Sequence, residues 1–281
     1  MSLGIGLHKG IEKSVYHALD YVSSHRLGLL RRSPAHLKWS LENPEEQTPA
    51  MMIGEAVHTA VLEFSKFQNL YVKAPDVDRR TKAGKECWDL FVSENVGKVV
   101  LGADEYVRVL EMSAAIARHE IAANLLNHCE EIELTAIWRD EDTGLTCKGL
   151  IDSFAPSLDN VNDLKTTSDA SPRSFERAIF QYGYHRQGAF YVDGMRALGK
   201  DVQHYTLIAV ENKAPYAVAV YRLTDEALDL GRRENDRLLK LYERCQRAND
   251  WPGYPLEVLD IGIPAWATKQ TENDFHQNLS I

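Results

Sequence analysis

The chain has 281 residues, of which 44% are hydrophobic and 26% charged, so it can bury a sizeable core and is not a disordered chain. Its formal net charge of −9 at pH 7 argues against a protein that coats nucleic acid, because phosphate binding is driven by Lys and Arg. No apolar run approaches the roughly 18–20 residues that span a bilayer, so a membrane-spanning helix is not predicted. The four cysteines form no C-x-x-C pair, which argues against a cysteine-rich zinc or iron–sulfur site.

The first half of the chain is predicted to be mostly helical. Pro34 suits the first turn of a helix, and apolar residues recur at helical spacing between residues 51 and 64. A polar, basic loop is predicted at residues 76–85. The predicted helices are residues 16–32, 34–41, 51–64, 86–95 and 104–126.

The second half alternates short β-rich runs with helical segments. The predicted strands are residues 133–138, 145–154, 161–166, 204–210 and 216–223, and the predicted helical regions are residues 171–198 and 224–248. This order predicts an α/β fold in which a mixed central sheet is flanked by helices. Without a repeat or linker, we expect one domain over residues 1–281. Its parts are N-terminal helices (1–50), a core (51–248) and an irregular tail (249–281).

The most informative stretch is a predicted hairpin that carries two aspartates and a lysine. Asp152 and Asp163 are equidistant from the turn centre, so the register places them opposite each other, and Lys165 shares a face with Asp163. Opposed carboxylates repel unless a divalent cation lies between them. Such a cation can also polarise a phosphoryl oxygen and acidify a bound water. Taken alone, the pattern also fits an ordinary hairpin whose acids face water.

Three further features accompany the hairpin. His58 lies on the predicted 51–64 helix among apolar neighbours, and Glu133 begins the strand before the hairpin. Gln187 and Tyr191 lie at i and i+4, on one helix face. Each feature by itself also fits a structural side chain.

Together these features resemble the RecB-like branch of the PD-(D/E)XK nucleases, and more narrowly the nuclease domain of exonuclease VIII (RecE) and its phage relatives. The similarity runs nearly end to end, although the family's proline before the first aspartate is Ile151 here. The segments that carry it are Gly54–Glu63, Arg79–Glu86, Lys148–Asp152, Asp163–Thr167, Tyr184–Tyr191, Trp251-Pro252 and Pro264–Trp266.

The resemblance implies a site for Mg²⁺ or Mn²⁺. His58, Asp152, Asp163 and the backbone carbonyl of Leu164 would ligate the ion, and Glu133 would be a further ligand or an outer neighbour. Such hard cations prefer oxygen ligands, and a site of this kind can also include one imidazole.

The resemblance also implies roles in catalysis and DNA binding. Lys165 would orient or help deprotonate the attacking water, and Gln187 and Tyr191 would position the site and the DNA backbone. The candidate phosphate contacts are Arg79, Arg80, Lys82 and Lys85 in the basic loop, which we expect to lie beside the active-site helix at residues 51–64. Arg31 and Arg32 are further candidates for holding a 5′ end.

The implied activity is digestion of double-stranded DNA from 5′ ends to 5′-mononucleotides, which leaves 3′ single strands for recombination. Family members commonly close into rings around the duplex, so the resemblance implies a homo-oligomer, such as a tetramer, and an annealing partner of the RecT type. We expect a cytoplasmic location, in a bacterial host of a phage or prophage, without a membrane partner.

Other hypotheses remain open at this point. One is a RecB-like nuclease of other polarity or with endonuclease activity. Another is a catalytically silent scaffold that binds DNA ends. A hydrolase of small metabolites with an unrelated metal site is a more distant one.

Overall fold

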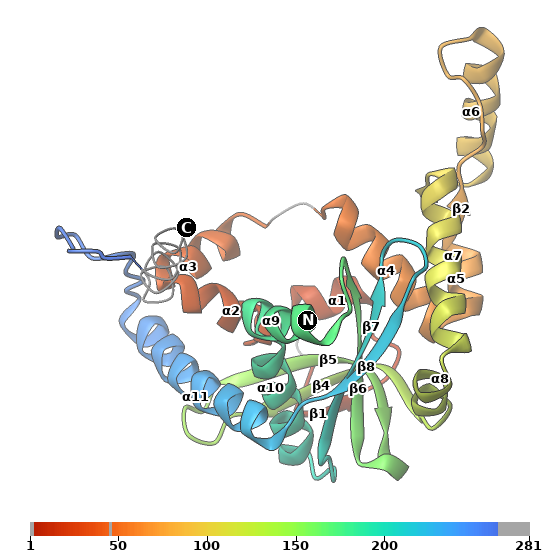
Figure 1. Ribbon diagram of the computed structural model, residues 1–281. Helices are drawn as coiled ribbons and strands as arrows, with labels where there is room; N and C mark the ends of the chain where they lie inside the picture. The colour runs from red at the N-terminus through yellow and green to blue at the C-terminus, as the bar shows by residue number, and fades with distance from the viewer. Residues whose placement is uncertain (1–2, 45–46, 264–281) are drawn as a thin grey trace, which may run out of the picture.

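A six-stranded mixed sheet forms the centre of the molecule (Figure 1). The computed structural model describes residues 3–44 and 47–263. The strand order is β1-β4-β5-β6-β7-β8, and neighbours are antiparallel except for the parallel pair β6–β7. The strands are β1 (Gly6–His8), β4 (Glu131–Arg139), β5 (Thr146–Ala155), β6 (Asn160–Thr167), β7 (His204–Glu211) and β8 (Val218–Arg222). The predicted mixed sheet flanked by helices is confirmed.

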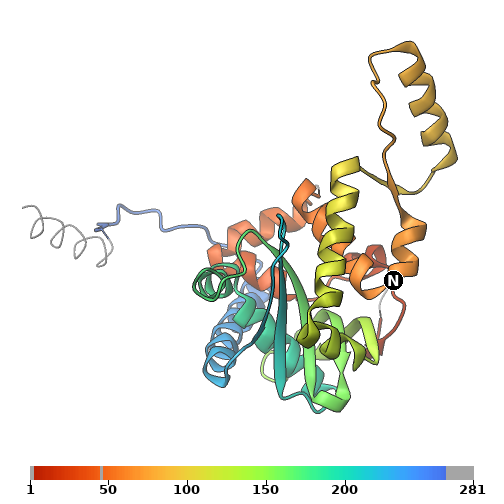
Figure 2. The same cartoon turned by 45° about the vertical axis from the view of Figure 1, so that its right-hand side comes forward.

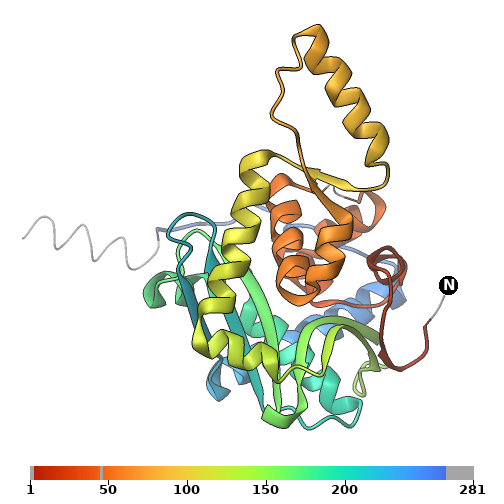
Figure 3. The ribbon, with the colours of Figure 1, turned by 90° about the vertical axis from the view of Figure 1, so that its right-hand side faces the viewer.

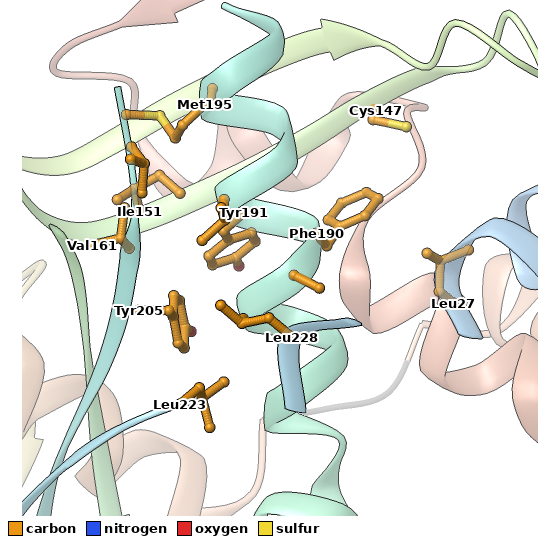
Figure 4. Close-up of a cluster of buried hydrophobic side chains, with 14 of the residues drawn as sticks. Leu27, Cys147, Ile151, Val161, Phe190, Tyr191, Met195, Tyr205, Leu223 and Leu228 are labelled. Atoms are coloured by element: carbon orange, nitrogen blue, oxygen red, sulfur yellow. The ribbon is translucent and has the colours of Figure 1, made fainter. Parts of the chain in front are cut away.

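Helices cover both faces of this sheet and create two hydrophobic cores. The helices against one face are α2 (Ser24–Arg32), α10 (Tyr184–Ala197) and α11 (Asp225–Ala248), and those against the other are α4 (Pro49–Leu62), α7 (Ala103–Arg118) and α8 (Glu120–Asn127). Figure 4 shows the first core, where Tyr191 of α10 lies toward the sheet residues Ile151 and Tyr205, and Phe190 points to the side of Cys147.

The helical crossover between β6 and β7 is what makes these two strands parallel. It consists of α9 (Pro172–Tyr182) and α10, which follow β6 and precede β7 in the chain. Gly183 separates the two helices in a left-handed conformation with a φ of 73°, so the single helical region predicted at 171–198 is in fact two helices.

Two other predicted helices are also divided. Residues 16–32 form α1 (Lys13–Ala18) and α2, because Ser23 caps a new helix by accepting a hydrogen bond from the Arg26 amide. Residues 104–126 form α7 and α8, because the His119 ring accepts from the Ala122 amide. Apolar periodicity continues across both breaks, so it did not reveal them.

An arm formed by residues 71–101 projects from the body of the molecule (Figures 2 and 3). It contains β2 (Tyr71–Lys73), α6 (Lys82–Glu94) and β3 (Val99–Leu101), and β2 pairs in parallel with β3 at its base. The helix begins earlier than the predicted residue 86, because Thr81 accepts a hydrogen bond from the Gly84 amide. The three-residue strands are too short to show a periodic pattern in the sequence.

The remaining segments complete the chain. They are α3 (Pro34–Glu42), α5 (Phe64–Leu70) and the 3₁₀ turn η1 (Pro156–Leu158). After α11, residues 249–263 contain neither helix nor strand, and the segment Pro264–Trp266 lies outside the described residues. Across residues 3–44 and 47–263, no helix has the length and apolar character needed to cross a membrane. The division into one domain stays a prediction.

Candidate active site

Three carboxylates lie in one row across the central sheet. In the β4–β5 register Ile132 pairs with Ser153 and Leu134 with Ile151, which places Glu133 opposite Asp152. In the β5–β6 register Ser153 pairs with Asn162, which places Asp152 opposite Asp163. The predicted hairpin register is therefore confirmed, and Glu133 on the preceding strand extends the row.

The backbone is distorted at this row. The β4–β5 pairing skips Glu133 and Asp152, and Glu133 has a φ of 47°, which side chains other than glycine rarely adopt. The β5–β6 pairing ends one residue before the two aspartates, and the Asp152 carboxylate instead accepts a hydrogen bond of 2.9 Å from the Leu164 amide. Irregular backbone of this kind costs stability and concentrates at functional sites.

The helix α4 brings His58 to the row. Its Nε2 lies 2.9 Å from the Leu164 carbonyl oxygen, and its Nδ1 lies 3.4 Å from an Asp152 carboxylate oxygen. Because a carbonyl oxygen can only accept, Nε2 carries the proton and donates it. Atoms of His58, Glu133 and Asp152 that can ligate a metal all lie within 4.8 Å of one another.

Asp163 makes different contacts from the other two carboxylates. One of its oxygens accepts a hydrogen bond of 2.9 Å from Gln187 Nε2, and the other forms an ion pair with Lys165 Nζ. The Asp163 carboxylate is therefore not part of the three-residue cluster. Leu164, between Asp163 and Lys165, packs into the opposite core, as the alternation of the strand predicted.

Burial gives the site its electrostatic character. It raises the pKa of Asp152 to about 7, with the nearby Asp163 charge as a further cause, and it also raises the pKa of Glu133. Burial and the Lys165 charge lower the pKa of His58. For Lys165, burial opposes the charge, but Asp163 and Asp152 outweigh it and raise its pKa. The protein thus holds carboxylates where their charge is costly without a cation.

Tyr191 closes one side of the site from α10. The residue is 92% buried, and a side chain on Gly149 would begin only 3.1 Å from its ring, so the glycine permits the close approach of strand and ring. Burial raises the pKa of Tyr191 well above its ordinary value, so the phenol stays protonated and can donate a hydrogen bond.

Two charged residues beside the row were not predicted. Lys13 of α1 has its Nζ 3.6 Å from Glu133 and 3.3 Å from Glu55 of α4. Glu55 lies three residues before His58 on α4, a spacing that could have indicated it. Lys13 gave no such signal, because it lies far from the other site residues along the chain.

A cavity of about 650 Å³ opens over these groups. The row carboxylates, His58, Lys165, Gln187 and Tyr191 line its floor, so the structure brings together every residue predicted for metal binding and catalysis. Its opposite wall is formed by α2 and includes Arg26, which the sequence did not indicate.

The basic residues predicted to lie beside the active-site helix do not lie there. They occupy the projecting arm, where Arg80 pairs with Asp78 and the Arg79 guanidinium lies 4.4 Å from the centre of the Trp88 ring. None of the four lines the active-site cavity; they are Arg79, Arg80, Lys82 and Lys85.

The other two basic candidates lie at the end of α2. Both side chains are exposed, but Arg31 lines a separate cavity of about 430 Å³ that also includes Gln187 and Tyr191, whereas Arg32 does not. Arg31 therefore lies near the active-site residues Gln187 and Tyr191, whereas Arg32 does not line a cavity with them.

The donor set fits a hard divalent cation. It offers carboxylate oxygens, a carbonyl oxygen and one imidazole, and its buried carboxylates have raised pKa values that a cation would reverse. The residues that would hold such an ion are His58, Glu133, Asp152 and the Leu164 carbonyl, with Asp163 next to them.

Comparisons with known proteins agree with this geometry. A family model described as a PDDEXK-like domain of unknown function (DUF3799) matches residues 23–258. A search of curated proteins finds no match to the sequence.

Two solved structures are similar to the chain. One, named as a candidate exonuclease from Eubacterium rectale, has 16% sequence identity and a TM-score of 0.54, and the match covers 93% of this chain and 98% of that one. The other, a phage-related exonuclease from Haemophilus somnus 129PT, has 13% identity and a TM-score of 0.35, and the match covers 82% of this chain and 96% of that one. The first likeness shows a shared fold, and the family match confirms the resemblance to the PD-(D/E)XK nucleases drawn from the sequence.

Proposed function

Because the chain belongs to the PDDEXK-like family, we propose that it is a metal-dependent nuclease that hydrolyses phosphodiester bonds in double-stranded DNA. The observation that carries this proposal is the row of Glu133, Asp152 and Asp163 with His58 above it and Lys165 beside it. Phosphodiester hydrolysis builds up negative charge on the phosphoryl oxygens. Buried carboxylates that can hold a divalent cation, together with a lysine, would provide the positive charge that stabilises it.

The residues divide the work of hydrolysis. A bound Mg²⁺ or Mn²⁺ would stabilise the charge on the phosphoryl oxygens and lower the pKa of a water. Lys165, whose pKa is raised by Asp163 and Asp152, serves as a fixed positive donor that orients the water or the scissile phosphate. Gln187 holds the Asp163 carboxylate in place through its 2.9 Å hydrogen bond.

The finer proposal is exonucleolytic digestion in the 5′→3′ direction, which releases 5′-mononucleotides and leaves 3′ tails for strand annealing. The resemblance to exonuclease VIII supports this polarity and the role in recombination. The same resemblance supports a ring-shaped homo-oligomer, an annealing partner of the RecT type and a cytoplasmic location in a bacterial host. Mg²⁺ is the proposed ion, with Mn²⁺ as its substitute.

Digestion of linear duplex DNA labelled at either the 5′ or the 3′ end tests the proposal. With Mg²⁺, the wild type should release 5′-labelled mononucleotide early, and Lys165→Ala should release none. A nicked circle should resist digestion if the enzyme requires ends, whereas early release of a 3′ label would favour the alternative polarity.

Loss of Lys165 leaves Asp163 buried without its ion pair, which can unfold the protein. The double variant Asp163→Asn/Lys165→Gln removes both charges and should be equally inactive while retaining a cooperative melt. Full activity of the wild type in excess EDTA would reject the proposal. A wild type that binds DNA ends but never cleaves them would instead favour a silent scaffold.

A further inference from the structure

A second cavity lies at the carboxyl ends of β6 and β7. It has a volume of about 670 Å³, and its floor includes Thr166 and Thr167 at the end of β6, Ser168 after it, and Asn212 directly after β7. Crevices outside the carboxyl ends of parallel strands are the usual ligand sites of open α/β sheets. In this sheet, β6 and β7 are the parallel pair, so the cavity lies where such a ligand is expected.

Two arginines from opposite sides of the sheet line this cavity. Arg108 comes from α7 and Arg177 from α9, and neither forms an ion pair with a described residue. The one acid in the lining, Glu105, accepts a hydrogen bond from the Gly102 amide at the start of its own helix. The lining therefore contains two guanidinium groups and one carboxylate, and that carboxylate already accepts a hydrogen bond from its own helix.

Arg108 also has an unsatisfied nitrogen. Its Nε is buried and has no hydrogen-bond acceptor within the described part of the chain, and the buried Oδ1 of Asn212 in the same cavity has no donor. Burial of a donor without an acceptor is costly, more so for a charged group. Arginine presents its donors as a planar fork that matches phosphate oxygens. An anion with several acceptor oxygens would supply the acceptor that Arg108 Nε lacks, whereas the Asn212 oxygen needs a donor that such an anion does not provide.

The cavity adjoins the catalytic lysine. Tyr184 lines it, and Lys165 Nζ lies 4.8 Å from the centre of the Tyr184 ring. Thr166, in the cavity floor, directly follows Lys165 along β6. Since a strand advances about 3.3 Å per residue, the cavity begins within one or two strand positions of the site of hydrolysis.

We infer that this cavity, here named the Arg108–Arg177 pocket, binds a backbone phosphate of the DNA strand next to the scissile phosphodiester. The inference rests on the proposed function, because it takes the substrate to be DNA. The serine and threonine hydroxyls of the floor add neutral donors of the kind that commonly contact DNA backbone.

A phosphate held in this pocket would fix the register of the strand relative to Lys165. The contact is the same before and during hydrolysis, because the bound phosphate does not react. Its loss should therefore raise KM and leave kcat nearly unchanged. A residue with a purely structural role would not produce this separation.

The test uses linear duplex DNA in which single phosphates near the cleaved end are replaced by neutral methylphosphonates. Binding is measured with Ca²⁺ in place of Mg²⁺, and KM and kcat are measured with Mg²⁺. The variants are Arg108→Gln, Arg177→Gln and the double variant. The matched control is Arg233→Gln/Arg237→Gln, which removes the same charge from exposed positions of α11 that form no ion pair within residues 3–44 and 47–263.

For the wild type, neutralisation of one specific phosphate should weaken binding about 10-fold, as expected for a charged hydrogen-bonded contact. The double variant should bind unmodified DNA about 10-fold more weakly, with kcat unchanged, and should no longer respond to that methylphosphonate. Its slope of log K against log salt should be smaller by about 0.7–0.9 for each lost contact. The control variant should still respond to the methylphosphonate.

The inference is overturned if the double variant cleaves and binds like the control, or if it responds to every methylphosphonate as the wild type does. In that case the proposed nuclease function stands. If the wild type neither binds nor cleaves DNA, both fall. The Arg177→Gln variant alone guards against misfolding, because Arg177 is exposed and its replacement leaves the core intact.

Discussion

The sheet-borne site and the projecting arm place their charged residues in different ways. At the site, residues from β4, β5, β6 and α4 meet across the fold, and Asp163 is 98% buried. On the arm, the ion pairs join residues close in sequence, such as Arg80 with Asp78, and the basic side chains of residues 79–85 are exposed. The site can therefore fix the mutual geometry that chemistry requires, whereas the arm offers reach and positive charge.

This difference suggests distinct roles for the two regions. Metal binding and hydrolysis depend on distances held to within a fraction of an ångström, so they belong on rigid strands. Contact with a DNA backbone needs charge at the right distance and tolerates movement. Changes at the site should therefore abolish activity, and changes on the arm should only weaken duplex binding.

The largest effect is expected from Asp152→Asn. The change removes the central carboxylate of the row, and we expect cleavage of linear duplex DNA to fall by about 10³-fold or more. Initial rates with saturating Mg²⁺ measure this. Lys85→Gln on the arm serves as the control with nearly unchanged kcat, and similar losses in both variants would break the distinction between site and arm.

A smaller effect is expected from Glu133→Gln, which tests the third strand of the row. Glu133 lies with His58 and Asp152 in the candidate metal cluster, so its loss should raise the Mn²⁺ concentration for half-maximal cleavage by about 10- to 100-fold. Glu131→Gln is the matched control, because Glu131 lies on the same strand but outside the cluster. An unchanged Mn²⁺ requirement would remove Glu133 from the site.

The stability of the metal-free protein should depend on pH through Asp152. Its pKa is about 7 in the folded state and about 3.9 in an unfolded chain, so the folded state binds more protons between these values. The free energy of unfolding should therefore fall as pH rises from about 4 to about 7. Below this window Asp152 is protonated in both states and does not lower the free energy of unfolding. Above it Asp152 is charged in both states, and the full cost of burying its charge lowers the free energy of unfolding.

Thermal melts of wild type and Asp152→Asn from pH 4 to pH 8 measure this dependence. The stability of the variant relative to the wild type should grow across the window and then level off. Saturating Mn²⁺ should remove the difference by stabilising only the wild type. Parallel stability curves for the two proteins would show that Asp152 is not held in the unfavourable charged state.

The smallest effect is expected on the arm. Lys85 is exposed and has no ion pair with a described residue, so Lys85→Gln should leave the melting temperature unchanged. If the arm contacts DNA, duplex affinity at low salt should fall a few-fold, with a salt slope smaller by about 0.9. The control is Lys200→Gln, which removes the same charge from an exposed position outside the arm. Equal losses of duplex affinity in Lys85→Gln and Lys200→Gln would argue against a DNA contact on the arm.

The sequence predicted the part of the site that depends on local rules. The period of a strand and the centre of a turn placed Asp152 opposite Asp163 and directed Leu164 into the core, and the structure confirms both. The approach of His58 came from the family resemblance, because no local pattern shows where a helix will pack. Lys13 was missed because its contact with Glu133 spans more than a hundred residues.

The arm shows the limit of local patterns more clearly. The basic segment was correctly recognised, but its placement beside the active-site helix was wrong, because the direction of the arm depends on how β2 and β3 pair at its base. The breaks at Ser23, His119 and Gly183 were also missed. At two of them a side-chain cap begins a new helix, and at the third a glycine separates the helices, while the apolar pattern runs on.

Calorimetric titration of Mn²⁺ into wild type and Asp152→Asn tests the central claim most directly, with Lys85→Gln as the control. The account predicts saturable binding to the wild type and to Lys85→Gln, and its loss in Asp152→Asn although that variant melts cooperatively. Equal binding to wild type and Asp152→Asn, or no binding to the wild type, would contradict a metal site on the carboxylate row.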